Sequence, residues 1–203
     1  MIGNDLVAFE ACRHYSFRRW QAYWGRILTD SEWENFFYAP NERAAWLYWA
    51  AKEAAWKVWN RRSAQRLLNP KSFKVKNVLW EGSEASFEVQ GPRLNLKGYA
   101  SINDDFLHAV VVAANQYAIT AKVCPKDSLE QSLNQDPRLI QHPFNKHFQS
   151  DSPHSKPQIS LSRNILGIPS LEIAGNVLDL PISLSHHGSW AAYAYVYPHR
   201  TQP

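Results

Sequence analysis

Two short segments of the sequence place acidic and basic residues at spacings that could perform chemistry. Residues 3–7, Gly-Asn-Asp-Leu-Val, are typical of a short buried strand that carries a carboxylate, Asp5. Residues 49–57, Trp-Ala-Ala-Lys-Glu-Ala-Ala-Trp-Lys, are typical of an amphipathic helix on which Glu53 and Lys57 share one face. Magnesium takes few protein carboxylates, keeps waters and completes its shell with phosphate oxygens. An acid on a strand that faces an acid and a cation on a helix therefore predicts a Mg²⁺–phosphate site.

Each of these residues also has an ordinary structural explanation. An Asp at the end of a strand is commonly a turn or cap residue, and Glu53 could form an i,i+4 pair with Lys57. Such a pair contributes about 0.2–0.5 kcal/mol, which is too little to offset the burial of a carboxylate on an apolar helix face. A metal ion is therefore the better partner for Glu53. Residues 182–186, Ile-Ser-Leu-Ser-His, add a hydroxyl and an imidazole near the other end of the chain.

A mixture of helices and strands must position these residues. The predicted helices cover residues 15–25, a segment that starts at 29–32, residues 41–66 and a short stretch at 137–141. The predicted strands cover residues 2–9, 73–80, 85–90, 106–113, 159–162, 170–174, 182–185 and 191–197. Residues 125–158 are predicted to be a long connection. The pattern predicts an α+β fold with helices packed on antiparallel sheets.

The tryptophans of the long helix are predicted to support the site rather than to bind a ligand. Trp46, Trp49, Trp56 and Trp59 are spaced by three or seven residues, which places them along one side of a helix. The usual reason for such a stripe is core packing. We therefore expect the tryptophans to form a rigid backing for Glu53.

Length and composition narrow the class of protein. With 203 residues and 45% hydrophobic content, the chain can bury a full core. No apolar run reaches membrane-spanning length, and the first residues lack the pattern of a signal peptide. The two cysteines, Cys12 and Cys124, do not form a zinc-binding pattern, and core packing is their expected role. We therefore expect a cytoplasmic protein that has no membrane segment.

Four short motifs in this chain occur together in one enzyme family. They are Gly-x-Asp before apolar residues at 3–7, Trp-x-x-Lys-Glu-Ala-x-x-Lys at 49–57, Gly-x-Pro at 167–169 and Ser-x-Ser-His at 183–186. With these motifs the chain resembles the 4′-phosphopantetheinyl transferases, which move phosphopantetheine from coenzyme A to a serine of a carrier protein. The stretch between about residues 115 and 158 does not match the family.

The resemblance implies roles for individual residues. Asp5 and Glu53 are expected to hold Mg²⁺ on the pyrophosphate of coenzyme A, while Lys57 neutralises phosphate oxygens. Glu53 is also expected to accept the proton of the carrier serine, with 3′,5′-ADP as the leaving group. Three further side chains are implied to contact coenzyme A: Ser185, His186 and Lys52. Arg163 or Lys156 is expected to compensate for the charge that is lost where Ile168 replaces a Lys that the family usually has. The implied activity is of the holo-acyl-carrier-protein synthase type, acting on an acidic acyl or peptidyl carrier protein in fatty acid or polyketide biosynthesis.

Two departures from the family pattern motivate an alternative function. The longer branch of the family often has Glu where this chain has Val7, and the Gly-x-Pro turn usually has Lys where this chain has Ile168. The alternative is a catalytically weak relative that binds carrier protein or coenzyme A without turnover. A third hypothesis, a nucleic-acid-binding module, rests only on the net charge of +4 and on scattered aromatic residues. Because no basic tract or nucleic-acid motif is present, we expect no nucleic-acid partner.

The order of the motifs bears on domain organisation. The acid motifs come first, as in the short, trimeric branch of the family, but the length is nearer to that of the two-lobe branch. We expect two pseudo-symmetric lobes in swapped order. Residues 1–115 are expected to form the lobe with the Mg²⁺-binding Asp and the Lys-Glu-Ala helix. Residues 116–158 are the segment that connects the two lobes, and residues 159–203 form the part of the second lobe that contains the Ser-x-Ser-His coenzyme A loop. A monomer with a complete site is the expected assembly, and a trimer is the alternative. Of the adjacent His186 and His187, only one is expected to point into a given cleft.

Overall fold

The computed structural model describes residues 1–12, 17–38, 42–63, 67–113, 117–140, 158–173 and 175–198. Its largest element is a five-stranded antiparallel sheet with the order β1-β5-β4-β3-β2. The strands are β1 (Ile2–Ala8), β2 (Lys74–Glu81), β3 (Glu84–Gly91), β4 (Leu94–Ile102) and β5 (Phe106–Val112). The first strand of the chain therefore forms one edge of this sheet.

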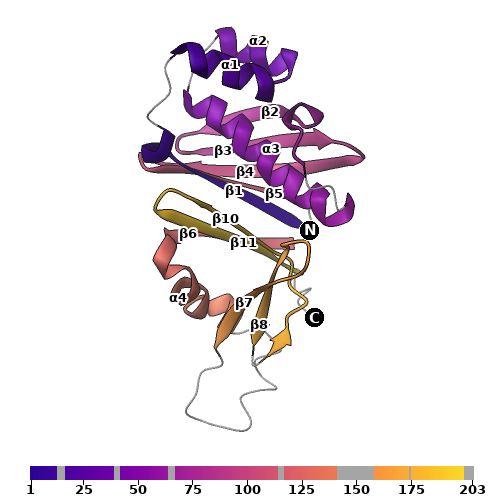
Figure 1. The fold of residues 1–203 in the computed structure, drawn as a ribbon, viewed down its shortest axis with the longest axis vertical. Coiled ribbons are helices and arrows are strands. Elements are labelled where there is room, and N and C mark those ends of the chain that lie inside the picture. The colour runs from indigo at the N-terminus through magenta and orange to yellow at the C-terminus, as the bar shows by residue number, and fades with distance from the viewer. Residues whose placement is uncertain are drawn as a thin grey trace.

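Helices cover one side of the sheet (Figure 1). They are α1 (Phe17–Ile27), α2 (Asp30–Tyr38) and α3 (Glu42–Ser63), with short 3₁₀ turns η1 (Phe9–Cys12) and η2 (Pro70–Ser72). Helix α3 packs directly on β1 and β5. Five alanines of α3 are fully buried, and their small side chains let the helix approach the sheet closely: Ala45, Ala50, Ala51, Ala54 and Ala55. Residues 1–113 are called the N-terminal part below.

The alternation of side chains along β4 explains how the sheet forms a core. Buried and exposed residues alternate without exception over its nine positions. Leu94, Leu96 and Ala100 join the core cluster beneath α3. Gly98 is the inward position that faces Phe87, and a Cβ atom there would lie 2.1 Å from a carbon of the Phe87 ring. The glycine therefore makes room for an aromatic side chain of the neighbouring strand.

Two smaller antiparallel sheets form the C-terminal part, residues 117–198. The first has the order β10-β11-β6 and consists of β6 (Tyr117–Pro125), β10 (Ile182–His187) and β11 (Trp190–Pro198). The second has the order β7-β8-β9 and consists of β7 (Ile159–Arg163), β8 (Pro169–Ile173) and β9 (Asn176–Val177). Between β6 and β7 lie η3 (Lys126–Ser128), α4 (Leu129–Asn134) and α5 (Pro137–Ile140).

The two parts meet where β1 lies against β10 and β11. Figure 1 shows the sheet β10-β11-β6 beside the β1 edge of the large sheet, on the side away from α3. Ile2 and Val110 of the N-terminal part share an apolar cluster with Ala194 and Val196 of the C-terminal part. The junction is therefore a packed interface, and it carries the functional motifs on both sides.

The structure confirms the α+β class, and each predicted strand lies within two residues of an observed one. The observed α1, α2, α3 and α5 match the four predicted helices, although residues 15–16, 41, 64–66 and 141 lie outside the described residues. Strands β4, β6 and β9 and helix α4 were not predicted. Residues 117–140 are more than a connection, because β6 pairs with β11 along its whole length. The pseudo-symmetry of two lobes and the domain boundaries stay predictions.

No helix in the described ranges is long and apolar enough to cross a membrane.

Candidate functional site

Close contact between β1 and α3 brings acidic and basic side chains together. A Cβ atom on Gly3 would lie 2.0 Å from the carbonyl oxygen of Ala54, so only glycine fits at this helix distance. Because side chains alternate along a strand, Asp5 lies on the same face as Gly3, toward α3. Glu53 precedes Ala54 in α3, and Lys57 follows one turn later. The same packing that excludes a side chain at Gly3 thus assembles the two carboxylates and the ammonium.

Lys57 joins β1, α3 and β10 at one point. Its Nζ atom donates to the carbonyl oxygen of Asn4 at 2.8 Å and to Asp5 Oδ1 at 3.2 Å. A third contact, at 3.4 Å, reaches the carbonyl oxygen of Leu184 in β10. In the described part of the chain the ion pair of Lys57 is with Asp5, rather than with Glu53 on its own helix. The simple i,i+4 alternative for Glu53 is therefore not what the structure contains.

The two carboxyl groups share an environment that disfavours two negative charges. Burial raises the pKa of Asp5, against the opposing effect of the Lys57 ammonium. Burial also raises the pKa of Glu53 to about 7, and the negative charge of Asp5 adds to that increase. In the described part of the chain Lys57 is ion-paired with Asp5 and not with Glu53. A second cation between the Asp5 and Glu53 carboxylates would offset the repulsion between their negative charges.

A cavity of about 270 Å³ opens onto these carboxylates from between the two parts. Asp5 and Glu53 line it from the N-terminal part, and His186 and His187 line it from β10. Cys12 and three aromatic side chains form other parts of the wall: Tyr23, Trp46 and Trp49. The stripe of tryptophans thus does what its spacing predicts, because Trp46 and Trp49 pack in the core and also support the cavity.

The adjacent histidines of β10 differ in their contacts. His186 is exposed. His187 is half-buried, and its Nδ1 atom accepts a hydrogen bond of 2.8 Å from the backbone N–H of Ala8. Both histidines line the same cavity, although their side chains leave β10 on opposite faces. The expectation that only one of the two points into a given cleft stays a prediction. His186 is the one whose ring is open to a ligand.

A second, more basic cavity of about 230 Å³ is lined by Lys57 and lies between the two parts. Lys57 and Arg61 line it from α3, and Arg163 and the turn at residues 167–169 line it from the C-terminal part. The Arg61 guanidinium donates to the carbonyl oxygen of Ile182. The Arg163 guanidinium donates to the carbonyl oxygen of Gly167 at 3.0 Å and is otherwise exposed. Lys156 lies outside the described residues. This cavity combines cations from both parts and suits an anion.

Ser185 does not fit the predicted contact with coenzyme A. Its side chain is buried with 7% exposure, and its Oγ accepts a hydrogen bond of 3.2 Å from the Asn4 side-chain amide. Ser183 is buried too, and its Oγ accepts from the Asn4 backbone N–H at 3.0 Å. Both hydroxyls therefore contact β1, and a ligand would have to displace Asn4 to reach Ser185.

Lys52 does not fit the predicted contact either. Its side chain has no exposed surface, and its Nζ donates to Glu32 Oε2 at 2.6 Å and to the carbonyl oxygen of Ile27 at 2.8 Å. A helix turns by about 100° per residue, so Lys52 leaves α3 in a different direction from Glu53. We therefore leave Lys52 out of the proposed site.

Sequence reasoning missed two residues that the site uses. Arg61 lies one turn after Lys57, and its spacing of four from a predicted site residue was the available signal. Asn4 occupies the variable position of the Gly-x-Asp motif, so the motif itself gave no reason to single it out. In the structure Asn4 contacts Ser183, Ser185, His108 and Lys57.

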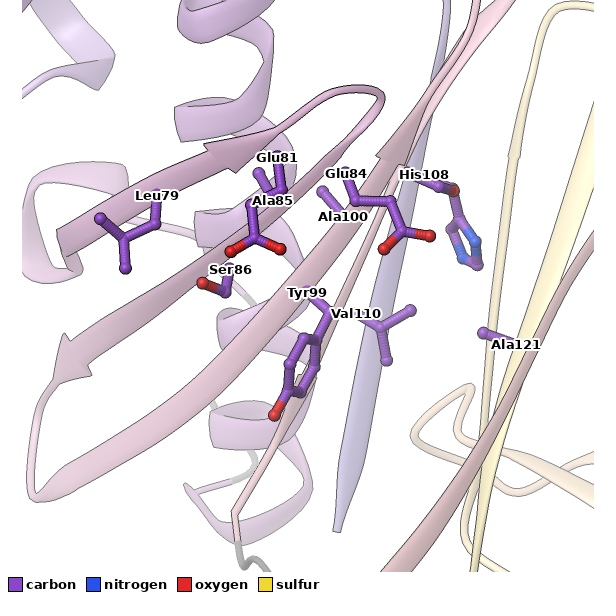
Figure 2. A pocket seen from close by; sticks show the side chains of 11 residues that line it. Leu79, Glu81, Glu84, Ala85, Ser86, Tyr99, Ala100, His108, Val110 and Ala121 are labelled. Carbon is purple, nitrogen blue, oxygen red and sulfur yellow. The ribbon is translucent and has the colours of Figure 1, made fainter.

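Another pocket lies on the open face of the large sheet, away from α3 (Figure 2). Its volume is about 370 Å³, which exceeds that of both cavities described above. Figure 2 shows Glu81, Glu84 and Tyr99 among the side chains that line it, and His108 on the side of Ala121, which belongs to the C-terminal part. Its described lining contains no lysine or arginine. The largest of these three cavities is therefore not the one that contains the charged motif residues.

The donor set at Asp5 and Glu53 fits Mg²⁺. Among the described residues no group of three or more His, Cys, Asp or Glu side chains is arranged to hold a metal ion. The chain therefore offers two carboxylates, with Val7 lining the cavity where the longer branch often has a third acid. Magnesium commonly uses one or two protein carboxylates with substrate phosphates. The charge conflict at the two carboxylates, described above, is the structural observation that favours a bound cation.

The comparison with protein families agrees with these motifs. A family model described as the 4′-phosphopantetheinyl transferase superfamily matches residues 1–122. This match covers more than half of the chain, and the chain belongs to that superfamily. The superfamily uses coenzyme A as substrate and acts on carrier proteins, and membership supports phosphopantetheinyl transferase activity. A search of curated proteins found no match.

Proposed function

We propose that this protein transfers 4′-phosphopantetheine from coenzyme A to a serine of an acidic apo carrier protein, as a Mg²⁺-dependent enzyme of the holo-acyl-carrier-protein synthase type. One observation carries the proposal. In a chain of this superfamily, two carboxylates from the N-terminal part and His186 from the C-terminal part line one cavity, and Lys57 is ion-paired at its edge. Phosphoryl transfer is catalysed mainly by positioning and by electrostatic stabilisation, which metal-binding carboxylates and cations can supply.

The proposed roles follow from the position of each side chain. Asp5 and Glu53 hold Mg²⁺, which when bound neutralises negative charge on the pyrophosphate of coenzyme A. Lys57 donates to phosphate oxygens, and its longest contact, at 3.4 Å to the carbonyl oxygen of Leu184, is the one most easily exchanged. His186 donates to a phosphate oxygen from the other side of the cavity. Arg61 and Arg163 bind a further anionic group of coenzyme A in the basic cavity.

Glu53 is proposed to act as the proton acceptor. The serine oxygen attacks the phosphorus that carries pantetheine, the bond to 3′,5′-ADP breaks, and the serine proton passes to Glu53. Glu53 lines the cavity beside Asp5, and a carboxylate within reach of the serine hydroxyl can accept its proton. A carboxylate has two oxygens, so contact with an ion through one of them leaves the other to accept the proton.

The experiment is a transfer assay read by intact mass. The protein is incubated with coenzyme A, Mg²⁺ and a panel of apo carrier proteins. The expected result is that at least one carrier gains the mass of one phosphopantetheine group, and that EDTA or the Asp5→Ala variant prevents the gain. A protein that binds coenzyme A in calorimetry but modifies no carrier would instead support the alternative of a binding relative without turnover, which Val7 and Ile168 motivate.

We further propose that a monomer contains a complete site, because the side chains of the first cavity come from both parts of one chain. Mixing the Glu53→Gln and His186→Ala variants tests this proposal. Subunits that share sites would regenerate wild-type sites and recover activity, whereas monomers would stay inactive. A trimeric mass with restored activity would contradict the proposal.

A further inference from the structure

Alternate side chains of β10 form a polar row against β1. Ser183, Ser185 and His187 are spaced by two, so they lie on one face of the strand. Each of the three accepts a hydrogen bond from β1. Ser183 accepts from the backbone N–H of Asn4, and Ser185 accepts from the side-chain amide of Asn4. His187 accepts from the backbone N–H of Ala8. We call Ser183, Ser185 and His187 the clasp row.

The clasp row satisfies groups that an edge strand would otherwise leave unpaired. Strand β1 pairs with β5 on one side only, so the N–H groups of its other edge need acceptors. Asn4 and Ala8 provide two of these N–H groups. Since a backbone N–H can only donate, Nδ1 of His187 must be an unprotonated acceptor, which puts the ring proton of a neutral His187 on Nε2.

A buried histidine supports the same contact from the other side. His108 of β5 is 4% exposed, and its Nε2 lies 3.0 Å from Nδ2 of Asn4. Asn4 Nδ2 thus lies between His108 and Ser185. The Asn4 side chain is fixed by both strands, and it fixes β10 in turn.

Helix α3 holds the free edge of β10 with a matched spacing. Lys57 and Arg61 lie four residues apart, and they donate to the carbonyl oxygens of Leu184 and Ile182, which lie two residues apart. Four residues of helix rise about 6 Å, and two residues of strand rise about 6.6 Å. The two cations therefore align with successive outward carbonyls of β10.

From these contacts we infer that Ser183, Ser185 and His187 are positioning residues, which hold β10 on β1 and so fix His186 relative to Asp5 and Glu53. They act on coenzyme A binding through His186 and do not touch the ligand. His186 lies between Ser185 and His187, so its placement depends on the clasp row on both sides. This inference rests on the proposed function for the part that concerns coenzyme A.

The first test needs no activity. In ¹⁵N NMR spectra of the wild-type protein, His187 should carry its proton on Nε2 with Nδ1 unprotonated. Amide hydrogen exchange at Asn4 should become about tenfold faster in Ser183→Ala, because the amide loses its acceptor. The matched control is Ser162→Ala, which removes a serine hydrogen bond between β7 and β8 in the same part of the chain. Unchanged exchange at the Asn4 amide, or a proton on Nδ1 of His187, would show that the clasp row does not hold β10 on β1 and would overturn the inference.

The second test separates positioning from direct contact. Ser185→Ala should raise the KM for coenzyme A about threefold to tenfold, the value of one hydrogen bond, with kcat little changed. In the His186→Ala background, Ser185→Ala should add no further increase, since it acts through His186. Full additivity would mean that Ser185 touches the ligand, and an unchanged KM would mean a purely structural role; both outcomes overturn the inference. A wild-type protein that binds no coenzyme A would refute the proposed function, while the exchange experiment would still decide whether the clasp exists.

Discussion

Lys52 and Lys57 lie five residues apart on α3, and each forms an ion pair with a carboxylate distant in sequence. Around Lys52 every charge is balanced. Glu32 Oε2 accepts from Lys52 and from the Thr29 N–H, and Oε1 accepts from the Val75 N–H, so this pair joins α2, α3 and β2 with its polar groups satisfied. Its two side chains have 0% and 1% exposure.

Around Lys57 the charges are not balanced. Its partner Asp5 lies beside a second carboxylate, Glu53, and burial together with the Asp5 charge raises the pKa of Glu53 to about 7. A cavity reaches both acids. Two lysines of one motif thus have different surroundings: Lys52 belongs to a closed, buried ion pair, and Lys57 belongs to the open group that we propose binds a metal ion and phosphate.

The largest expected effect is on catalysis at the open group. Glu53→Gln should lower the transfer rate by about 10²–10⁴-fold, the range for loss of a general base, while the protein stays folded. The rate is measured by intact mass of the carrier and the fold by circular dichroism. A folded Glu53→Gln variant with near-wild-type turnover would remove Glu53 from the mechanism.

The second expected effect is on stability at the closed pair. Lys52→Met leaves the buried carboxylate of Glu32 without a cation, which should lower the free energy of unfolding by about 3–5 kcal/mol. Urea denaturation measures the change. The double variant Lys52→Met/Glu32→Gln should recover part of the loss because no unpaired charge remains. Equal losses for Lys52→Met and for Lys57→Met, whose side chain is 21% exposed, would contradict the distinction between the two pairs.

The third effect is on coenzyme A affinity. His186→Ala should weaken binding by about 1.5–3 kcal/mol, the value of a hydrogen bond to a charged group, as measured by calorimetry. His186→Gln keeps a neutral donor and should retain part of the affinity. An unchanged dissociation constant in both variants would show that the exposed histidine does not contact the ligand.

The smallest effect is on the pH dependence of stability without Mg²⁺. The folded protein holds the Glu53 proton up to about pH 7, and the unfolded chain releases it near pH 4.5. Unfolding between these values releases a proton, so the contribution of Glu53 to the free energy of unfolding falls as pH rises from about 4.5 to 7. Lys57 and partial exposure limit the change to about 1 kcal/mol.

His108 changes stability in the opposite direction, because its buried ring has a pKa lowered to about 4 and the unfolded chain takes up the proton near pH 6.5. The difference in the free energy of unfolding between wild type and Glu53→Gln removes the contribution of His108 and leaves that of Glu53. The variant should gain relative stability as pH rises through this window in urea titrations. A difference that does not vary with pH would contradict the raised pKa.

The sequence predicted most of the fold because period-two alternation and capping residues are local signals. Strand β4 was missed although it alternates without exception, since Gly98 and Lys97 lower its apparent strand preference. The glycine is favourable only because the Phe87 ring faces it, and that is a contact between strands. Strand β6 was missed because its partner β11 lies more than sixty residues later in the chain.

The part of the site that depends on helix geometry could be predicted from the sequence. Glu53 and Lys57 are about 40° apart around a helix, so their common face follows from the spacing. The roles of Lys52 and Ser185 do not follow from spacing, because they depend on Glu32 and Asn4 approaching from other elements. Polar motif residues can bind a ligand or another part of the chain, and only the tertiary structure decides.

We propose that Asp5 and Glu53 form an open, metal-binding group, whereas Glu32 belongs to a closed ion pair with Lys52. A Mg²⁺ titration of protein with ¹³C-labelled carboxyl groups, followed by NMR at pH 7.5, tests it directly. The account predicts that the Asp5 and Glu53 carboxyl signals shift together as Mg²⁺ is added and that the Glu32 signal does not move. A titration that leaves both Asp5 and Glu53 unchanged would contradict the account.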